Sequence, residues 1–138
     1  MSYDLMVFEK TAAPKNRGDF MEWYEKQTEW DEDHEYNDPA VTSNGLRNWF
    51  MAITKKFPQM NGPCAPDDEA WEKMEEMGTD SYVTDYSIGK EMIYAAFSWS
   101  LADEAFETVK ELAKEHGVGF FDVSSTDGEI IFPDGIRI

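Results

Sequence analysis

The sequence predicts a single α+β domain, residues 1–138, with a ferredoxin-like split βαβ antiparallel sheet and helices on one face. The first observation is a hairpin pattern. Ser81–Ile88 and Glu91–Trp99 are rich in aromatic and β-branched residues, and Gly89-Lys90 between them suits a type II′ turn. The second is an amphipathic helix directly after the hairpin. The third is the length of 138 residues, which is enough for one hydrophobic core.

The N-terminal segment predicts a strand followed by a helix. Ser2–Glu9 carries apolar residues on both faces, which is typical of a central strand. Asp19 is a suitable N-cap for a helix over residues 20–30. We therefore expect the chain to open with the middle of the sheet.

Two further helices are predicted before the hairpin. One covers about residues 44–57 and has an apolar face, and the other is acidic, covers about residues 68–77 and ends at Gly78. Trp71 and Met74 are expected to point inward from the acidic helix. The candidate N-caps are Thr42 or Ser43 for the first helix and Asp67 or Asp68 for the second.

The segment after the hairpin predicts a helix, a strand and a C-terminal β extension. Ser100 and Asp103 resemble a capping box at the start of the helix. Val118–Val123 has the composition of a strand, a turn is predicted over residues 124–128, and residues 129–138 predict two short strands. In this arrangement we expect the first and third strands to form a parallel central pair.

The net charge of −17, from 12 basic and 29 acidic residues, restricts the partners. Direct binding to nucleic acid or to an anionic membrane is disfavoured, because phosphate binding needs clustered Lys and Arg. A basic protein partner is compatible with this charge, and solubility alone also explains it. The chain has no long apolar run and no N-terminal signal pattern, and Cys64 is its one cysteine. We expect a cytoplasmic protein without a membrane span or internal disulfide.

Several short segments carry a resemblance to a known family. They are Ser2–Leu5 with Val7, Phe57-Pro58, Ile88-Gly89, Ile93-Tyr94, Phe97–Ser100, Ala102–Ala105, Glu115–Val118 and Phe121-Asp122. On these segments the chain resembles a family of small acidic uncharacterised bacterial proteins that open with a SYDL-type strand and close with an EHG-then-strand segment. The resemblance covers residues 14–80 poorly and implies no activity, cofactor or catalytic residue. Some similar small acidic bacterial proteins are immunity partners of toxins, which is an analogy of size and charge.

The most distinctive polar segment is an acidic loop over residues 31–39. Every second residue from Asp31 to Asn37 is acidic or an amide, as in the first part of a calcium-binding EF-hand loop. The template then fails, because Tyr36 stands where glycine is required and Thr42 where a bidentate Glu is required. A solvated loop is the main interpretation, and adventitious binding of a divalent cation is the alternative.

The sequence predicts no catalytic set, no metal site and no cofactor. His34 and His116 are the two histidines, and with one cysteine they exclude a Cys- or His-rich zinc site within the chain. Asp4 and Asp122 lie on predicted strands and would form an acid–base pair if those strands were neighbours. A small enzyme or small-molecule binder that uses the open sheet face is therefore the alternative function.

The predicted binding site is the acidic loop with its flanking aromatic residues, since such a patch suits a basic protein surface. Its residues are Trp30, Asp31, Asp33, His34, Glu35 and Tyr36. The leading hypothesis is a non-enzymatic acidic binding module for a protein partner with a basic face. A homodimeric structural domain, associating through the sheet or the C-terminal tail, is a further alternative.

Overall fold

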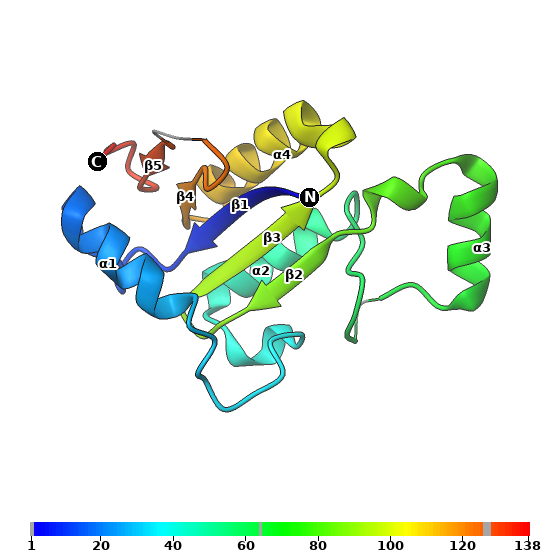
Figure 1. Ribbon diagram of the computed structural model, residues 1–138, viewed down its shortest axis with the longest axis horizontal. Coiled ribbons are helices and arrows are strands. Elements are labelled where there is room, and N and C mark those ends of the chain that lie inside the picture. Colours follow the sequence, from blue (N-terminus) through cyan, green and yellow to red (C-terminus); the bar gives the residue numbers. More distant parts are fainter. Residues whose placement is uncertain (1, 64, 126–127) are drawn as a thin grey trace.

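The computed structural model describes residues 2–63, 65–125 and 128–138 of the chain. Over these residues it is an α+β fold with one five-stranded antiparallel sheet and four α-helices (Figure 1). The strands are β1 (Tyr3–Phe8), β2 (Asp85–Ile88), β3 (Met92–Phe97), β4 (Gly119–Phe121) and β5 (Ile130–Ile131). The α-helices are α1 (Arg17–Gln27), α2 (Asn44–Ile53), α3 (Asp68–Met77) and α4 (Ala102–Glu115). Within the described ranges, no helix is long and apolar enough to cross a membrane.

The strands follow the order β2-β3-β1-β4-β5, and every neighbouring pair is antiparallel. β1 lies between β3 and β4, so the predicted central position of the first strand is confirmed. The predicted parallel pairing of the first and third strands is wrong, because Tyr3 pairs with Phe97 and Phe8 with Met92. The connection through α1, α2 and α3 brings β2 back parallel to β1, and the hairpin then reverses β3.

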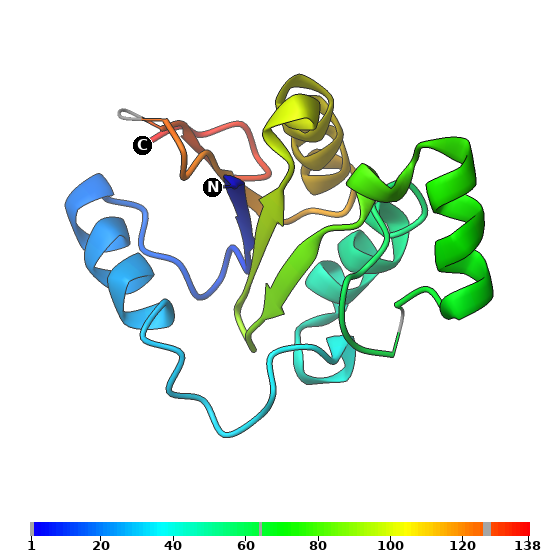
Figure 2. The same ribbon diagram turned by 45° about the vertical axis from the view of Figure 1, so that its right-hand side comes forward.

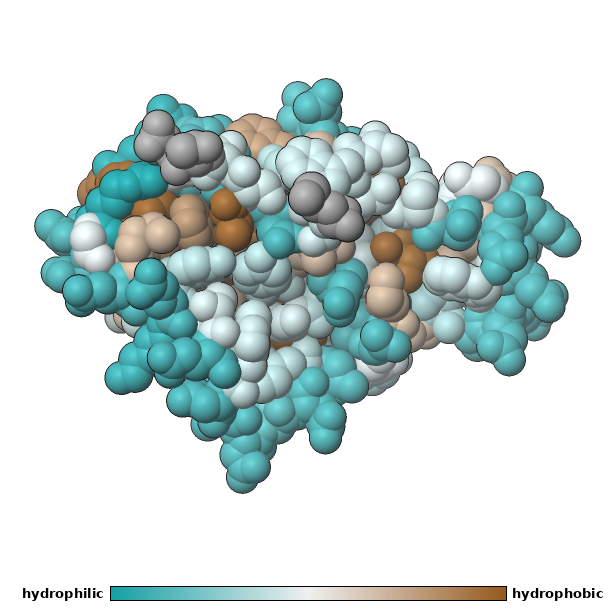
Figure 3. Space-filling view, viewed as in Figure 1, coloured by the Kyte–Doolittle hydropathy of each residue, from teal (hydrophilic) through white to brown (hydrophobic). Residues whose placement is uncertain are grey.

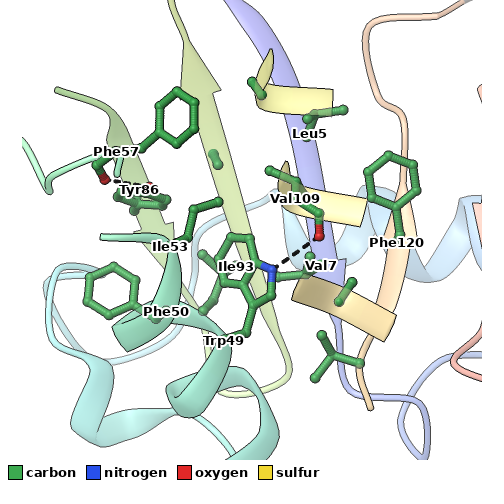
Figure 4. Packing of buried hydrophobic residues seen from close by; sticks show 14 of the residues in the cluster. Leu5, Val7, Trp49, Phe50, Ile53, Phe57, Tyr86, Ile93, Val109 and Phe120 are labelled. Carbon is green, nitrogen blue, oxygen red and sulfur yellow. Dashed lines mark hydrogen bonds between the residues drawn. The ribbon is translucent and has the colours of Figure 1, made fainter. Parts of the chain in front are cut away.

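The face of the sheet covered by α2 and α4 carries the larger core (Figure 4). Alternation along β1 points Leu5 and Val7 to this face, and both are fully buried. Trp49 of α2 reaches α4, where its Nε1 donates a hydrogen bond to the Val109 carbonyl at 3.3 Å. Burial of this large indole therefore leaves its polar atom satisfied.

The opposite face of the sheet is covered at one end by α1 (Figure 2). Met6 and Phe8 of β1 point to this side, and the ring centroids of Phe8 and Phe20 of α1 are 5.0 Å apart. A Cβ atom at Gly119 of β4 would lie 2.1 Å from the Phe8 ring, so this packing requires a glycine. The prediction that all helices lie on one face is wrong. Because β1 carries apolar side chains on both faces, both faces of the sheet must be covered where it lies.

The helix ends confirm some local signals. Ser43 caps α2 by accepting the Leu46 amide, and Asp67 caps α3 by accepting the Ala70 amide. Gly78 ends α3 in the left-handed conformation, with φ +71°. These predictions held because each signal acts within one helical turn.

Two other helix starts and the hairpin turn differ from the prediction. Asn16, not Asp19, caps α1, and it accepts the Asp19 amide at 3.2 Å. α4 follows a single turn of 3-10 helix, and Leu101 stands at its N-cap in place of Ser100. In the hairpin the Gly89 amide donates to the Met92 carbonyl at 2.8 Å. The two loop residues are thus the next pair along, Lys90-Glu91.

α3 stands apart from the body of the molecule (Figures 1 and 2). All ten of its residues are described, and none of them is buried. Trp71 is 37% exposed and Met77 is 70% exposed. The prediction that Trp71 and Met74 point into the core is wrong, because neither residue is buried.

The C-terminal extension folds back on itself, with β5 as the first of the two predicted strands and an isolated bridge between Ile131 and Arg137 in place of the second. The Phe132 amide donates to the Ile136 carbonyl at 2.8 Å, and the Ile138 amide donates to the Ile130 carbonyl at 3.1 Å. We call residues 130–138 the C-terminal hairpin. Of the turn predicted before it, residues 126–127 lie outside the described residues.

Candidate functional site: an anchored acidic loop

Glu32 anchors the acidic loop to the β2–β3 hairpin. Its Oε1 accepts the Lys90 backbone amide at 3.1 Å and a hydrogen bond from His34 Nε2 at 2.6 Å. The Glu32 amide donates to the Tyr36 hydroxyl at 2.6 Å. Hydrogen bonds to a charged group contribute about 1.5–3 kcal/mol, roughly twice those between neutral groups. An irregular segment is therefore held in one position.

His34 is a structural part of this anchor, because both of its ring nitrogens are engaged within the loop. The Tyr36 backbone amide donates to Nδ1 at 3.1 Å, so Nδ1 carries no hydrogen. Nε2 then carries the hydrogen and donates it to Glu32. The 2.6 Å contact joins His34 to Glu32 within the loop. His34 has no free nitrogen to act as a base.

Two aromatic residues close the loop at its ends. Trp30 and Tyr36 both have left-handed backbones, with φ +55° and +60°, which costs a non-glycine residue of order 1 kcal/mol. Their ring centroids are 5.3 Å apart, and Trp30 also lies 6.0 Å from the ring of Tyr94. The Tyr36 carbonyl accepts the Ile88 amide at 2.8 Å. These contacts hold both strained residues.

The residues between these ends alternate in direction. Glu32 and His34 point inward, whereas Asp31, Asp33 and Glu35 are exposed. Trp30 is 39% exposed despite its ring contacts. We call Trp30, Asp31, Asp33 and Glu35 the acidic row. The loop lies at the bottom of the molecule in Figure 1, and Figure 3 shows that the surface there is hydrophilic.

All six predicted site residues lie in this loop, but they fall into two groups with different roles. Trp30, Asp31, Asp33 and Glu35 face solvent, and His34 and Tyr36 hold the loop together. The sequence prediction missed Glu32. Its spacing of two from His34 was the available signal, since alternate residues of an extended segment share one side.

Beside the loop, the open part of the sheet carries tyrosines and a carboxylate, and its surface is pale between hydrophilic margins in Figure 3. Both Asp4 oxygens are occupied, by the Tyr94 hydroxyl at 2.5 Å and the Ser2 hydroxyl at 2.5 Å. Burial, and then the bond to Asp4, raises the pKa of Tyr94. Burial also raises the pKa of Tyr24, and a hydrogen bond with Tyr94 partly offsets it. Both hydroxyls are therefore donors at neutral pH.

Asp4 and Asp122 lie on opposite faces of the sheet. Continuing the β1–β4 register beyond Met6–Phe121 places Asp122 opposite Leu5, which faces α2 and α4. Asp122 accepts the Ser125 hydroxyl at 2.9 Å. Burial, and then the charge of Asp122, raises the pKa of Tyr3 to about 12. The acid–base pair considered from the sequence is not formed.

The remaining candidates are also accounted for. His116 is the C-cap of α4, and its amide donates to the Leu112 carbonyl at 2.9 Å. Cys64 lies outside the described residues. In the part of the chain that the structure describes, no three His, Cys, Asp or Glu side chains gather closely enough to hold a metal ion.

Comparison of the chain with protein-family models, curated proteins and solved structures finds no match.

Proposed function

We propose that the chain is a non-enzymatic binding module that contacts a basic protein through the acidic row. The observation that carries the proposal is the alternation of the loop. Three inward contacts fix the segment, and three carboxylates with one exposed indole face solvent. A preformed surface avoids the cost of ordering a loop on binding. The net charge of −17 would steer a basic partner toward it.

A pull-down with matched baits tests the proposal. The baits are the wild type, a row variant (Asp31→Asn, Asp33→Asn, Glu35→Gln) and a control variant on α3 (Glu72→Gln, Glu75→Gln, Glu76→Gln). Both variants remove three charges, so they separate the surface from the net charge. Lysate of the source organism is applied at low salt, eluted with a salt step and identified by mass spectrometry.

We expect a stoichiometric basic protein on the wild type and on the α3 control, lost from the row variant and released by salt. Retention by the row variant, or equal loss from both variants, would refute the acidic row as the contact. An empty eluate across several growth conditions would count against a protein partner altogether.

The proposal extends to the fold and the family. The order β2-β3-β1-β4, with alternating directions, corresponds to two interleaved split βαβ units and supports a ferredoxin-like topology. α1 on the opposite face and the outlying α3 would be departures from it. The quoted sequence segments support kinship with the small acidic bacterial proteins, and with it a cytoplasmic, immunity-like role.

Small-molecule binding on the open sheet face is the second candidate. It is favoured by the contact between the Tyr94 hydroxyl and the Asp4 carboxylate, which fixes two polar groups on the tyrosine-bearing face of the sheet. A ligand screen by NMR on the wild type and on Tyr94→Phe would test it. Saturable shifts on β3 that the substitution weakens would support this function, and their absence would remove it.

A further inference from the structure

The basic residues of this acidic protein gather on one flank. Six of the twelve Lys and Arg residues surround the C-terminal hairpin. Lys10 and Lys15 line a hollow on one side of it, Lys110, Lys114 and Arg137 line a second hollow, and Arg17 donates to the carbonyls of Gly128 and Ile138. This flank lies at the β5 edge of the sheet, and the acidic row lies at the β2–β3 turn.

The second hollow combines an apolar wall with a rim of three cations, Lys110, Lys114 and Arg137, and one carboxylate, Asp134. It lies between α4 and the C-terminal hairpin and has a volume of about 330 Å³. Its apolar wall includes the buried Val118 and Phe120, at and just before β4, and the half-buried Ile131 and buried Phe132 of the C-terminal hairpin. We call it the tail cleft. Its size is at the lower end of the range for small-molecule sites, roughly 300–1,000 Å³.

One carboxylate positions two of the three rim cations. Glu129 Oε1 lies 3.6 Å from Lys110 Nζ, and Glu129 Oε2 lies 3.5 Å from Arg137 Nε. These contacts draw a cation from α4 and one from the C-terminal hairpin to the same rim. The third cation, Lys114, has no carboxylate within ion-pair distance among the described residues.

Lys110 and Lys114 are also neighbours on one face of α4, because they lie four residues apart. Like charges at this spacing destabilise a helix by a few tenths of a kcal/mol. The end of the helix favours one cation in its last turn, but it does not require a second cation one turn earlier. A local cost of this kind is typical of a functional surface.

We propose that the tail cleft binds an amphipathic anion, an apolar chain or ring that carries one carboxylate. The apolar part contacts Phe120 and Ile131. The carboxylate takes charge-assisted hydrogen bonds from Lys114 and Arg137 at the rim. This site is separate from the acidic row and does not depend on the protein-binding function.

The test is an NMR titration of the full chain with octanoate, 1-octanol and octylammonium below their aggregation concentrations. We expect saturable octanoate shifts confined to the last two turns of α4 and the C-terminal hairpin. Lys114→Gln should weaken octanoate binding by about tenfold, the scale of one charge-assisted hydrogen bond. Lys73→Gln on α3 removes the same charge far from the cleft and should leave the affinity unchanged.

Three results would overturn the proposal. These are no saturable shift with octanoate, equal affinity for octanol or octylammonium, and equal affinity of Lys114→Gln and the wild type. Thermal unfolding of each variant establishes that it is folded. The readout is affinity rather than stability, because Lys114 also interacts with the end of α4.

Discussion

The acidic loop and α3 are both rich in Asp and Glu, but the loop is held against the sheet and α3 is not buried against it. The loop has no regular secondary structure, yet Glu32 and Tyr36 fix it to the hairpin, and His34 joins these two residues within the loop. α3 is a regular, capped helix, yet none of its ten described residues is buried. A helix satisfies its own backbone hydrogen bonds, so it can form without packing into the core. An irregular backbone holds one shape only where other groups satisfy it.

The largest expected effect is at the loop anchor. Glu32→Ala removes the acceptor of the Lys90 amide and of His34 Nε2, and should lower the free energy of unfolding by about 2 kcal/mol. Asp33→Ala removes the same charge from the exposed row and should change it by less than about 0.5 kcal/mol. Chemical denaturation measures both. Equal effects of the two substitutions would show that the loop is not anchored by Glu32.

The next effect is at the hydroxyl that accepts the Glu32 amide. Tyr36→Phe keeps the ring contacts and loses this hydrogen bond, so it should cost about 1 kcal/mol. Combined with Glu32→Ala the two effects should not add, because both residues belong to one network. Full additivity in a double-mutant cycle would mean that the inward contacts act independently.

In α3 we expect a substitution to act locally. Gly78→Ala places a side chain on a left-handed residue, which costs of order 1 kcal/mol. Amide exchange within α3 should therefore become roughly fivefold faster. The global free energy of unfolding should not change, because no residue of α3 is buried in the core. An equal global loss would show that α3 unfolds together with the sheet.

The smallest expected effect concerns the support of α3 at low pH. Hydrogen bonding from Tyr82, and then from Lys56, lowers the pKa of Glu104 on α4. This contact is therefore stabilising above the usual Glu range and is lost as the pH falls through the lowered pKa of the folded state. Amide shifts of residues 79–83 should titrate there, and Glu104→Gln should abolish that step. Persistence of the step in the variant would assign it to another group.

The comparison also explains what the sequence could predict. The ends of α2 and α3 were predictable because Ser43, Asp67 and Gly78 act on amides and carbonyls within one turn. The anchor of the loop was not, because Glu32 and Lys90 are 58 residues apart in the sequence. The exposed acidic row could be identified, but its inward partners could not be assigned without the hairpin.

The same limit applies to the sheet. Alternating apolar residues identified the strands, and the two apolar faces of the first strand indicated its central position. Which helix covers which face depends on contacts such as Phe8 with Phe20 and Gly119, which no local pattern encodes. The position of α1 was therefore predicted incorrectly.

The borders of the sheet have a consequence for colloidal behaviour. At one border the Pro58 carbonyl accepts the Thr84 amide at 2.8 Å, and the Tyr36 carbonyl accepts the Ile88 amide at 2.8 Å. At the other, the Ile138 amide occupies the Ile130 carbonyl at 3.1 Å. An uncovered edge strand presents unpaired backbone amides and carbonyls, to which strands of other chains can add to form fibrils. The segments at Tyr36 and Pro58 and the C-terminal hairpin therefore cover the two edges of the sheet, and such cover opposes edge-to-edge association at high concentration.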